Sequence, residues 1–395
     1  MNKIGDIQNK NILLLQGPVG LFFKKLDMQF RKKGANTYRI GLNAGDQFFS
    51  YSDNYTAYRG TIEEWSIFIK KFFQEKEIHQ IFLFGDCRIY QSIAIQAALA
   101  FEIEVFVFEE GYIRPYYITL ERHGVNDFSR ISRDPQFYLN LSPMKVPDPI
   151  DATPNPISNW SIVIMYYLVA KLFSFRYKNY RHHRNFSAIQ EFFFGTRSLI
   201  RKVIYTKRDK NFLPIVEGIL SKKYFFVPLQ THNDFQILQH SHYGSIEKFI
   251  IDVLESFSEY APKDLFLIFK HHPIDRGRKN YQKFILEQAR ELAIEDRILV
   301  VHDLYLPSCL THAKGTVTIN STVGFSSIEY KTPTIALGNA LYDMKGLTNI
   351  GKSLSDFWND PEIPDNNLYI KFRQYLIQTT QLNGSFYGLM PDELK

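Results

Sequence analysis

Short apolar runs recur along the chain, and each is followed by a few polar residues and then by a helix-like amphipathic segment. They cover residues 11–15, 38–42, 81–84 and 105–108 in the first half, and 223–229, 264–269, 298–301, 316–319 and 333–337 in the second. Runs of this length between polar loops predict buried strands, and their alternation with helices predicts parallel sheets. The sequence therefore predicts an α/β protein.

The two series of strands predict two domains. A chain of 395 residues exceeds one ordinary core, and the proline-dense stretch 143–156 reads as an extended connector. We predict an N-terminal Rossmann-like domain over 1–210, with an apolar-basic insertion at about 157–210, and a C-terminal Rossmann-like domain over 211–350. A helical tail, 351–395, is expected to pack back on the first domain. The two Rossmann-like halves are expected to face each other across a cleft.

An acidic turn follows the run 105–108. Glu109 and Glu110 come directly after it, and Gly111 permits a sharp turn. Side chains alternate along a strand, so the two carboxylates should diverge, one towards a cleft. Asp86 and Arg88 end a neighbouring strand and should reach the same rim. The alternatives are an exposed acidic turn and a local pair between Asp86 and Arg88.

Polar residues also end the strands of the second half, around Gln230, His272, His302 and Ser321. Ser321 and Thr322 lie at the start of a predicted helix, where hydroxyls and backbone N–H groups favour a phosphate. His272 precedes a proline and is held extended, so its imidazole can reach a second phosphate oxygen. No DxD-like carboxylate pair stands ready for Mg²⁺, which favours a metal-free nucleoside monophosphate donor, so neither a metal nor another cofactor is expected.

The charge and the apolar segments of the chain indicate which kinds of partner it can bind. The formal charge of +6 suits an anionic substrate or membrane surface, and no basic-aromatic groove points to nucleic acid. The apolar segment 157–175 abuts basic residues that continue to 210, which suits peripheral contact with an anionic membrane; a buried helix pair with a solvated basic side is the alternative. No run is long enough to span a bilayer, no signal peptide is expected, and two distant cysteines fit a reducing compartment.

Several motifs together resemble the KpsS/LipB family of bacterial capsule proteins. They lie at 85–88, 108–115, 118–121, 124–126, 228–236, 270–277 and 319–324, and the resemblance extends roughly from 11 to 341. It implies a retaining β-Kdo glycosyltransferase of the GT-B fold, with CMP-β-Kdo as donor. The implied acceptor is lysophosphatidylglycerol, to which the first Kdo of a capsule linker is added, at the cytoplasmic face of the inner membrane. A partner poly-Kdo transferase and the capsule export machinery are further implied partners.

The resemblance also implies residue roles. Related β-Kdo transferases carry Glu-Asp-Gly where this chain has Glu-Glu-Gly, so Glu110 inherits the role of the nucleophile, with a side chain longer by one methylene. Retention of configuration requires two displacements, which gives a carboxylate this task. The remaining expected roles are a base at Asp86 or Glu109, a Kdo carboxylate clamp at Arg88 or Arg114, phosphate contacts at His272, Ser321 and Thr322, and nucleoside contacts at Gln230, Asp234 and Gln236.

Two other functions fit the same sequence. One is a transferase of this architecture that uses another nucleotide sugar or makes a teichoic-acid-like polymer. The other is a non-catalytic component of capsule export or assembly. Retention of both the acidic turn and the His-Pro and Ser-Thr loops argues against the second.

Overall fold

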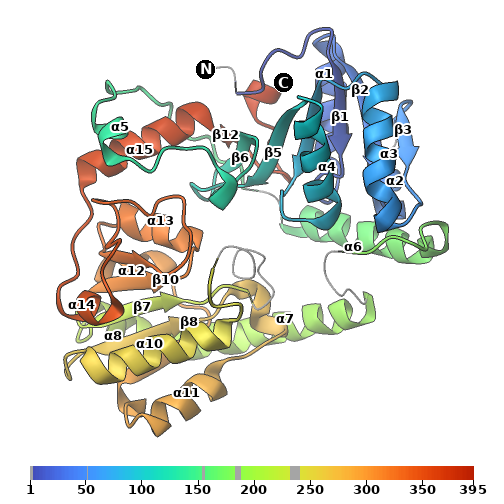
Figure 1. Cartoon of the computed structure of the whole chain (residues 1–395). Coiled ribbons are helices and arrows are strands. Elements are labelled where there is room, and N and C mark those ends of the chain that lie inside the picture. The colour runs from blue at the N-terminus through green and yellow to red at the C-terminus, as the bar shows by residue number, and fades with distance from the viewer. Residues whose placement is uncertain (1–2, 51, 154–155, 183–187, 232–240) are drawn as a thin grey trace. The chain divides into compact units, whose positions relative to one another are not determined.

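The computed structural model describes residues 3–50, 52–153, 156–182, 188–231 and 241–395, which form two compact units (Figure 1). Unit 1 is built from three stretches: the residues up to Arg130, Lys145–Ala188 and Gln374–Lys395. Unit 2 comprises Ile131–Met144 and Ile189–Arg373. The chain therefore passes between the units four times.

These units do not follow the expected boundary at residue 210. The unit 1 part of the predicted insertion ends at Ala188, and the basic half that follows belongs to unit 2. The tail is also divided, because residues up to Arg373 belong to unit 2 and only the last stretch, from Gln374, joins unit 1.

Unit 1 is organised around a seven-stranded sheet in the order β12-β6-β5-β4-β1-β2-β3. The first five strands in the chain pair in parallel, whereas β6 is antiparallel to β5, and β12 is antiparallel to β6. The strands are β1 (Asn11–Leu15), β2 (Asn36–Gly41), β3 (Tyr55–Ala57), β4 (Gln80–Phe84), β5 (Glu104–Glu110), β6 (Tyr117–Arg122) and β12 (Gln381–Asn383). Its helices are α1 (Phe22–Lys32), α2 (Ala44–Ser50), α3 (Ile62–Glu75), α4 (Ile89–Ala100) and α6 (Pro156–Leu172).

The purely parallel sheet predicted from the sequence is wrong for unit 1. Strands β3 and β12 have three residues each, too few to show a period of two. Strand β6 lies between β5 and β12 and is buried along five of its six residues, so it lacks the alternation of a half-exposed strand.

Unit 2 is organised around a five-stranded parallel sheet in the order β11-β10-β7-β8-β9. Its strands are β7 (Tyr224–Pro228), β8 (Phe266–Lys270), β9 (Ile298–Val301), β10 (Gly315–Thr318) and β11 (Thr334–Ala336). Its helices are α5 (Pro135–Leu139), α7 (Ala188–Asp209), α8 (Leu213–Glu217), α10 (Ile246–Tyr260), α11 (Gln282–Glu291), α12 (Leu306–His312), α13 (Thr322–Glu329), α14 (Leu354–Asn359) and most of α15 (Asn366–Thr379), with a short 3₁₀ helix, η4, at Pro273–Gly277. The predicted α/β fold, with one sheet at the centre of each unit, is confirmed.

Helix starts were well marked in the sequence. Thr61 caps α3 through a capping box, in which Thr61 N–H donates to Glu64 Oε2 over 2.9 Å and Glu64 N–H donates to the Thr61 hydroxyl. Ser245 caps α10 in a similar way. Such caps satisfy backbone N–H groups that have no partner within the helix, which fixes where each helix begins.

Candidate functional site

The acidic turn of unit 1 lies at the carboxyl end of its sheet. Strands β4 and β5 are parallel neighbours, so their last residues meet at one edge. Asp86 and Arg88 follow β4 there, and Glu109 and Glu110 end β5. The predicted shared rim is therefore present within unit 1.

Glu109 is the shielded carboxylate of this turn. It is half-buried, and its Oε1 accepts the backbone N–H of Glu110 over 2.9 Å. Burial raises the pKa of Glu109 to about 7, and the charges of Glu110 and Asp86 add to the rise, while Arg88 opposes it. A carboxyl group with this pKa can take up or release a proton near neutral pH.

Glu110 is the open carboxylate. Its side chain is 46% exposed, and its Oε2 lies 4.0 Å from Nη1 of Arg114. The turn that separates it from the next strand needs glycine, because a Cβ at Gly111 would lie 2.1 Å from the backbone oxygen of Tyr117. The two adjacent carboxylates thus have different surroundings: Glu109 is half-buried and bonded to the backbone, whereas the Glu110 side chain is more open to a ligand.

Asp86 has a supporting position. It is buried, and its carboxylate accepts the backbone N–H of Val125 over 2.8 Å and the thiol of Cys87 over 3.2 Å. These contacts tie the loop after β4 to the loop after β6. Because its oxygens are already engaged, Asp86 is less suited than Glu109 to receive a proton from a substrate.

The C-terminal segment adds a tyrosine that sequence reasoning missed. Phe386 packs its ring against Phe84 and Phe108, with centroids 5.1 and 6.2 Å away, and so holds the segment against the ends of β4 and β5. The adjacent Tyr387 has its pKa raised to about 12, first by burial and then by the charge of Glu110. Nothing in the sequence links this tyrosine to the acidic turn, since only the fold of the tail brings them together.

In unit 2, the predicted loops again share one sheet edge, because β7, β8, β9 and β10 are all parallel. Gln230 follows β7 and is buried. Its amide donates to Asn320 Oδ1 over 3.0 Å, and its oxygen accepts the backbone N–H of Asn320 over 3.2 Å. This reciprocal pair fixes the start of the Ser321 loop, so Gln230 shapes the site rather than offering both ends of its amide to a nucleoside.

Ser321 caps α13, which begins at Thr322. Its hydroxyl accepts the N–H of Val323 over 3.2 Å, and its carbonyl accepts the hydroxyl of Tyr342 over 2.5 Å. Gly324 permits this approach, since a Cβ there would lie 2.1 Å from the Tyr342 hydroxyl oxygen. Thr322 begins the helix and is partly exposed, so its hydroxyl and the helix start remain the elements for an anion.

His272 follows β8 and caps η4. Its Nδ1 accepts the backbone N–H of Ile274 over 3.2 Å. A neutral imidazole that accepts at Nδ1 carries its proton on Nε2, so this nitrogen is a donor suited to a phosphate oxygen. The sequence predicted this residue and its extended backbone.

A stack of rings lies behind this histidine. His271 and His302 stack with centroids 4.2 Å apart, and Tyr205 of α7 covers His302 at 3.9 Å. Burial, together with neighbouring cations, lowers the pKa of His271 to about 4 and that of His302 to about 2. Both rings are therefore neutral near pH 7 and act as a structural support for the loops.

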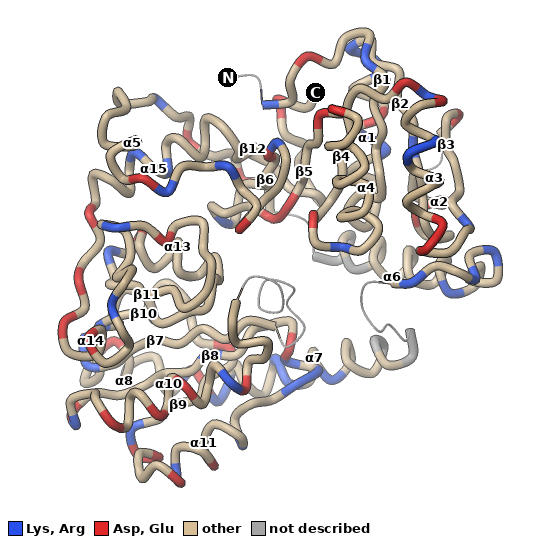
Figure 2. The backbone as a smooth tube through the Cα atoms, in the orientation of Figure 1, with Lys and Arg blue, Asp and Glu red and all other residues tan. Residues whose placement is uncertain are grey.

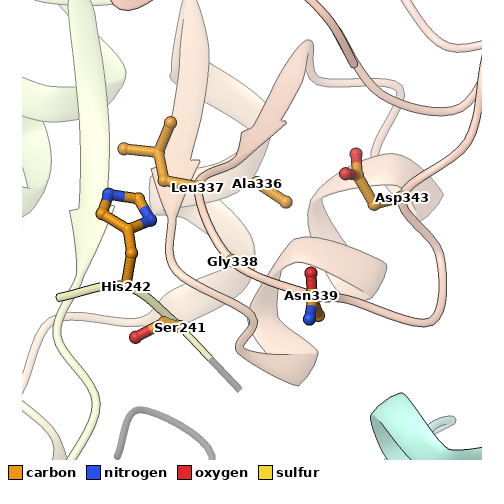
Figure 3. A pocket seen from close by; sticks show the side chains of 7 residues that line it. All are labelled: Ser241, His242, Ala336, Leu337, Gly338, Asn339 and Asp343. Carbon is orange, nitrogen blue, oxygen red and sulfur yellow. The ribbon is translucent and has the colours of Figure 1, made fainter. Parts of the chain in front are cut away.

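An open pocket of about 510 Å³ lies at the end of β11 (Figure 3). Its lining residues are Ser241, His242, Ala336, Leu337, Gly338, Asn339 and Asp343. Gly338 N–H donates to the carbonyl of Ile319 over 3.0 Å, so the pocket wall is bonded to the segment that carries Ser321. The pocket is large enough for part of a nucleotide sugar, and the sequence did not single it out.

Two predicted nucleoside contacts, Asp234 and Gln236, lie outside the described residues. Within the described ranges, no group of three His, Cys, Asp or Glu side chains is arranged to hold a metal ion. Among the helices that the structure describes, none has both the length and the apolar character needed to cross a membrane.

Comparisons with known proteins agree with the motifs. A family model described as "Capsule polysaccharide biosynthesis protein" matches residues 79–387. The chain is 39% identical to the capsule polysaccharide export protein KpsS of Escherichia coli, with 96% of this chain and 98% of that protein covered. It is 37% identical to the capsule polysaccharide modification protein LipB of Neisseria meningitidis serogroup B, with 96% and 92% covered.

Among solved structures, the chain is similar to the β-Kdo 2,7 transferase KpsC of Thermosulfurimonas dismutans, at 12% identity and a TM-score of 0.41, with 92% of this chain and 89% of that chain covered. The sequence comparisons establish the relationship without it. From the family-model match and two relatives aligned over nearly their full length, the chain belongs to the capsule polysaccharide biosynthesis family that contains KpsS and LipB.

Proposed function

We propose that the chain is a retaining β-Kdo transferase that moves Kdo from CMP-β-Kdo to lysophosphatidylglycerol and so starts the poly-Kdo linker of a capsule. The observation that carries the proposal is the turn at the end of β5. There an accessible carboxylate, Glu110, stands beside a shielded one, Glu109, whose pKa of about 7 suits proton transfer. A double displacement needs these two properties in two separate groups.

In the first step, an oxygen of Glu110 attacks C2 of Kdo. The bond from C2 to the phosphate oxygen breaks, and CMP leaves with the bonding electrons. In the second step, the acceptor hydroxyl attacks C2 and displaces Glu110, while its proton passes to Glu109. Arg114, near Glu110, and Arg88, beside Glu109, are the cations of this rim and can bind the Kdo carboxylate.

The donor phosphate is assigned to unit 2. His272 Nε2, the Thr322 hydroxyl and the start of α13 are groups that stabilise a leaving phosphate. The polar pocket beside this loop receives the part of the donor that adjoins the phosphate. No step of this proposal requires a metal ion.

The decisive experiment incubates the protein with CMP-Kdo and a fluorescent lysophosphatidylglycerol. The wild type should form a product heavier by one Kdo, with β configuration. Glu110→Gln should abolish transfer and still bind CMP, because the amide is not a nucleophile but preserves the shape of the turn. Transfer by this variant at the wild-type rate would remove Glu110 from the nucleophile role.

The donor assignment has its own test. His272→Ala should weaken CMP binding about tenfold or more, the loss expected for one charge-assisted hydrogen bond. His312→Ala, on α12, is the matched control. If both variants bind CMP with the affinity of the wild type, the phosphate is held elsewhere. Stronger stabilisation by UDP or GDP than by CMP in thermal unfolding would instead favour another nucleotide sugar.

A second function is favoured by one observation: the E. coli relative is named a capsule polysaccharide export protein. Under this alternative, the chain assists capsule export or assembly without catalysis. Such a component should show no Kdo transfer and no stabilisation by CMP. The same two assays therefore separate the alternatives.

A further inference from the structure

Helix α7 (Ala188–Asp209) has one face bound to unit 2. A Cβ on Gly277 would lie 2.1 Å from the backbone oxygen of Phe194, so the helix touches the end of η4 directly. Further along, Arg201 Nη1 donates to the carbonyl of Arg276 over 3.0 Å, and Tyr205 stacks on His302. These α7 residues are spaced by seven and four positions, so they lie on one side of the helix, here called the inner face.

The opposite side of α7 is apolar and uncovered. Leu199, Ile200, Val203 and Ile204 are 58, 59, 58 and 54% exposed. They form two pairs spaced by four residues, so they make one continuous strip along the helix, here called the outer face. Single exposed apolar residues are ordinary, but four large ones on adjacent turns mark an interaction surface.

The charges around the outer face are all positive. Arg197, Lys202 and Lys207 are exposed beside it, and Figure 2 shows the Lys and Arg positions along α7. Between Phe193 and Asp209 the sequence has one acidic residue, Asp209 itself. That carboxylate is buried and accepts from Arg208 Nε over 2.6 Å, so it does not offset the exposed cations.

We propose that the outer face of α7 docks onto an anionic lipid bilayer. Leucine, isoleucine and valine side chains would enter the boundary between headgroups and acyl chains, and the flanking cations would reach lipid phosphates. The helix would lie along the surface, because its inner face is held by the unit 2 loops. A second copy of this chain is a poorer occupant, because symmetric pairing would set these cations against each other without acidic partners.

Helix α6 in unit 1 also has one side held by its own unit and apolar residues exposed elsewhere. Tyr166 turns inward and donates to the buried Asp46 over 2.6 Å, whereas Ile164, Met165 and Leu168 are 51, 45 and 49% exposed. Helix α6 lies in the apolar part of the segment that the sequence analysis singled out, and α7 lies in its basic part.

The test is flotation with vesicles of phosphatidylcholine, with and without phosphatidylglycerol. The variant Ile200→Asp/Val203→Asp places two carboxylates on the outer face. Its matched control is Ile67→Asp/Ile219→Asp, at positions 73 and 74% exposed on other elements. The wild type and control should bind the phosphatidylglycerol vesicles, and the α7 variant should bind them at least about tenfold more weakly. Raising the salt concentration should weaken wild-type binding as well.

Equal flotation of the α7 variant and the control, at equal thermal midpoints, would overturn the proposal. So would binding to phosphatidylcholine alone as strong as to the anionic vesicles, or a wild-type dimer that the variant abolishes. The inference does not depend on the sugar that is transferred. The α7 variant should keep activity on a short-chain acceptor dissolved without vesicles, so loss of docking and loss of chemistry are distinguishable.

Discussion

Two glutamates near the edge of the unit 1 sheet hold protons at a pH where most glutamates have lost theirs. Burial raises the pKa of both Glu109 and Glu121 to about 7. Glu121 is held by the Tyr112 hydroxyl, which donates to it over 2.6 Å, and by Ser129. In the unfolded chain both groups would ionise near 4.5, so folding raises their proton affinity.

The first prediction concerns Glu109. As pH rises from about 4.5 to about 7, the unfolded chain releases this proton and the folded protein retains it, so stability falls across that window. Glu109→Gln removes the cost of ionising the buried group. It should be more stable than the wild type at pH 8, by about 1–3 kcal/mol, with a smaller difference at pH 5. Urea unfolding at both pH values measures this.

Glu75→Gln is the control for Glu109, because Glu75 lies on the surface of α3 with its side chain 56% exposed. Its unfolding free energy should follow that of the wild type at both pH values. A Glu109→Gln difference that stays constant with pH would mean that the carboxyl does not titrate in this window.

The sequence predicted which residues end the strands, but not how their side chains are used. Glu109, Glu110 and His272 stand where the apolar runs predicted them. The pairing of Gln230 with Asn320 and the approach of Tyr387 depend on loops and on the tail, whose positions no local pattern encodes.

The second prediction concerns that amide pair. Gln230→Ala and Asn320→Ala should each loosen the Ser321 loop and lower the free energy of unfolding. The double variant should lose less free energy than the sum of the two single losses. The coupling free energy should be about 1–2 kcal/mol, as for a buried pair joined by two hydrogen bonds. Unfolding of the four proteins of the cycle measures it, and additive effects would contradict a direct interaction.

At the scale of elements, β12 ties the C-terminal segment into the first sheet through Gln381. This side chain is buried; its oxygen accepts the N–H groups of Tyr112 and Ile113 over 3.0 and 3.4 Å, and its amide donates to the Thr119 hydroxyl over 3.0 Å. One residue of the last strand thus fixes the loop that follows the acidic turn.

The third prediction is that Gln381→Ala lowers the free energy of unfolding by about 2–4 kcal/mol, because buried backbone N–H groups lose their acceptor. Gln378→Ala is the matched control, since its amide donates to the exposed carbonyl of Lys145. Its effect should stay within about 0.5 kcal/mol. Thermal unfolding of both variants measures the two losses of unfolding free energy. Equal losses would show that the buried contact of Gln381 does not stabilise the protein more than the exposed contact of Gln378.

Elements with strong local signals were predictable and those defined by distant partners were not. The capping box of α3 and the cap of α13 lie within four residues. Strand β12 is antiparallel to β6, a partner more than two hundred positions earlier in the sequence, and has only three residues. Sequence periodicity cannot indicate such a pairing, because only the folded sheet brings the two strands together.

At the scale of the whole molecule, buried titratable groups give the two units opposite responses to acid. In unit 1, the pKa values of Asp46, Glu109 and Glu121 are raised, so the folded unit holds these protons more tightly than the unfolded chain does. Unit 1 is therefore more stable in mild acid than at neutral pH. In unit 2, His271 and His302 have lowered pKa values, so the unfolded chain binds protons below about 6.5 that the folded unit excludes. Unit 2 therefore loses stability as pH falls below that value.

The fourth prediction is that lowering the pH from 7.5 to 5 protects unit 1 and destabilises unit 2. Hydrogen exchange resolved by peptide, corrected for the intrinsic rate, should show slower exchange in β4 and β5 and faster exchange in β8 and β9. A parallel change in both units would mean that they unfold together or that other groups dominate.

The three-stretch composition of unit 1 has a consequence for synthesis. Residues 374–395 supply β12, Gln381 and the Phe386 ring, and they are synthesised after every residue of unit 2. Unit 2, complete at Arg373, can close while translation continues. The acidic turn is made early, among the first 115 residues, but it can reach its finished form only after unit 2 has been synthesised and residues 374–395 have joined the sheet of unit 1.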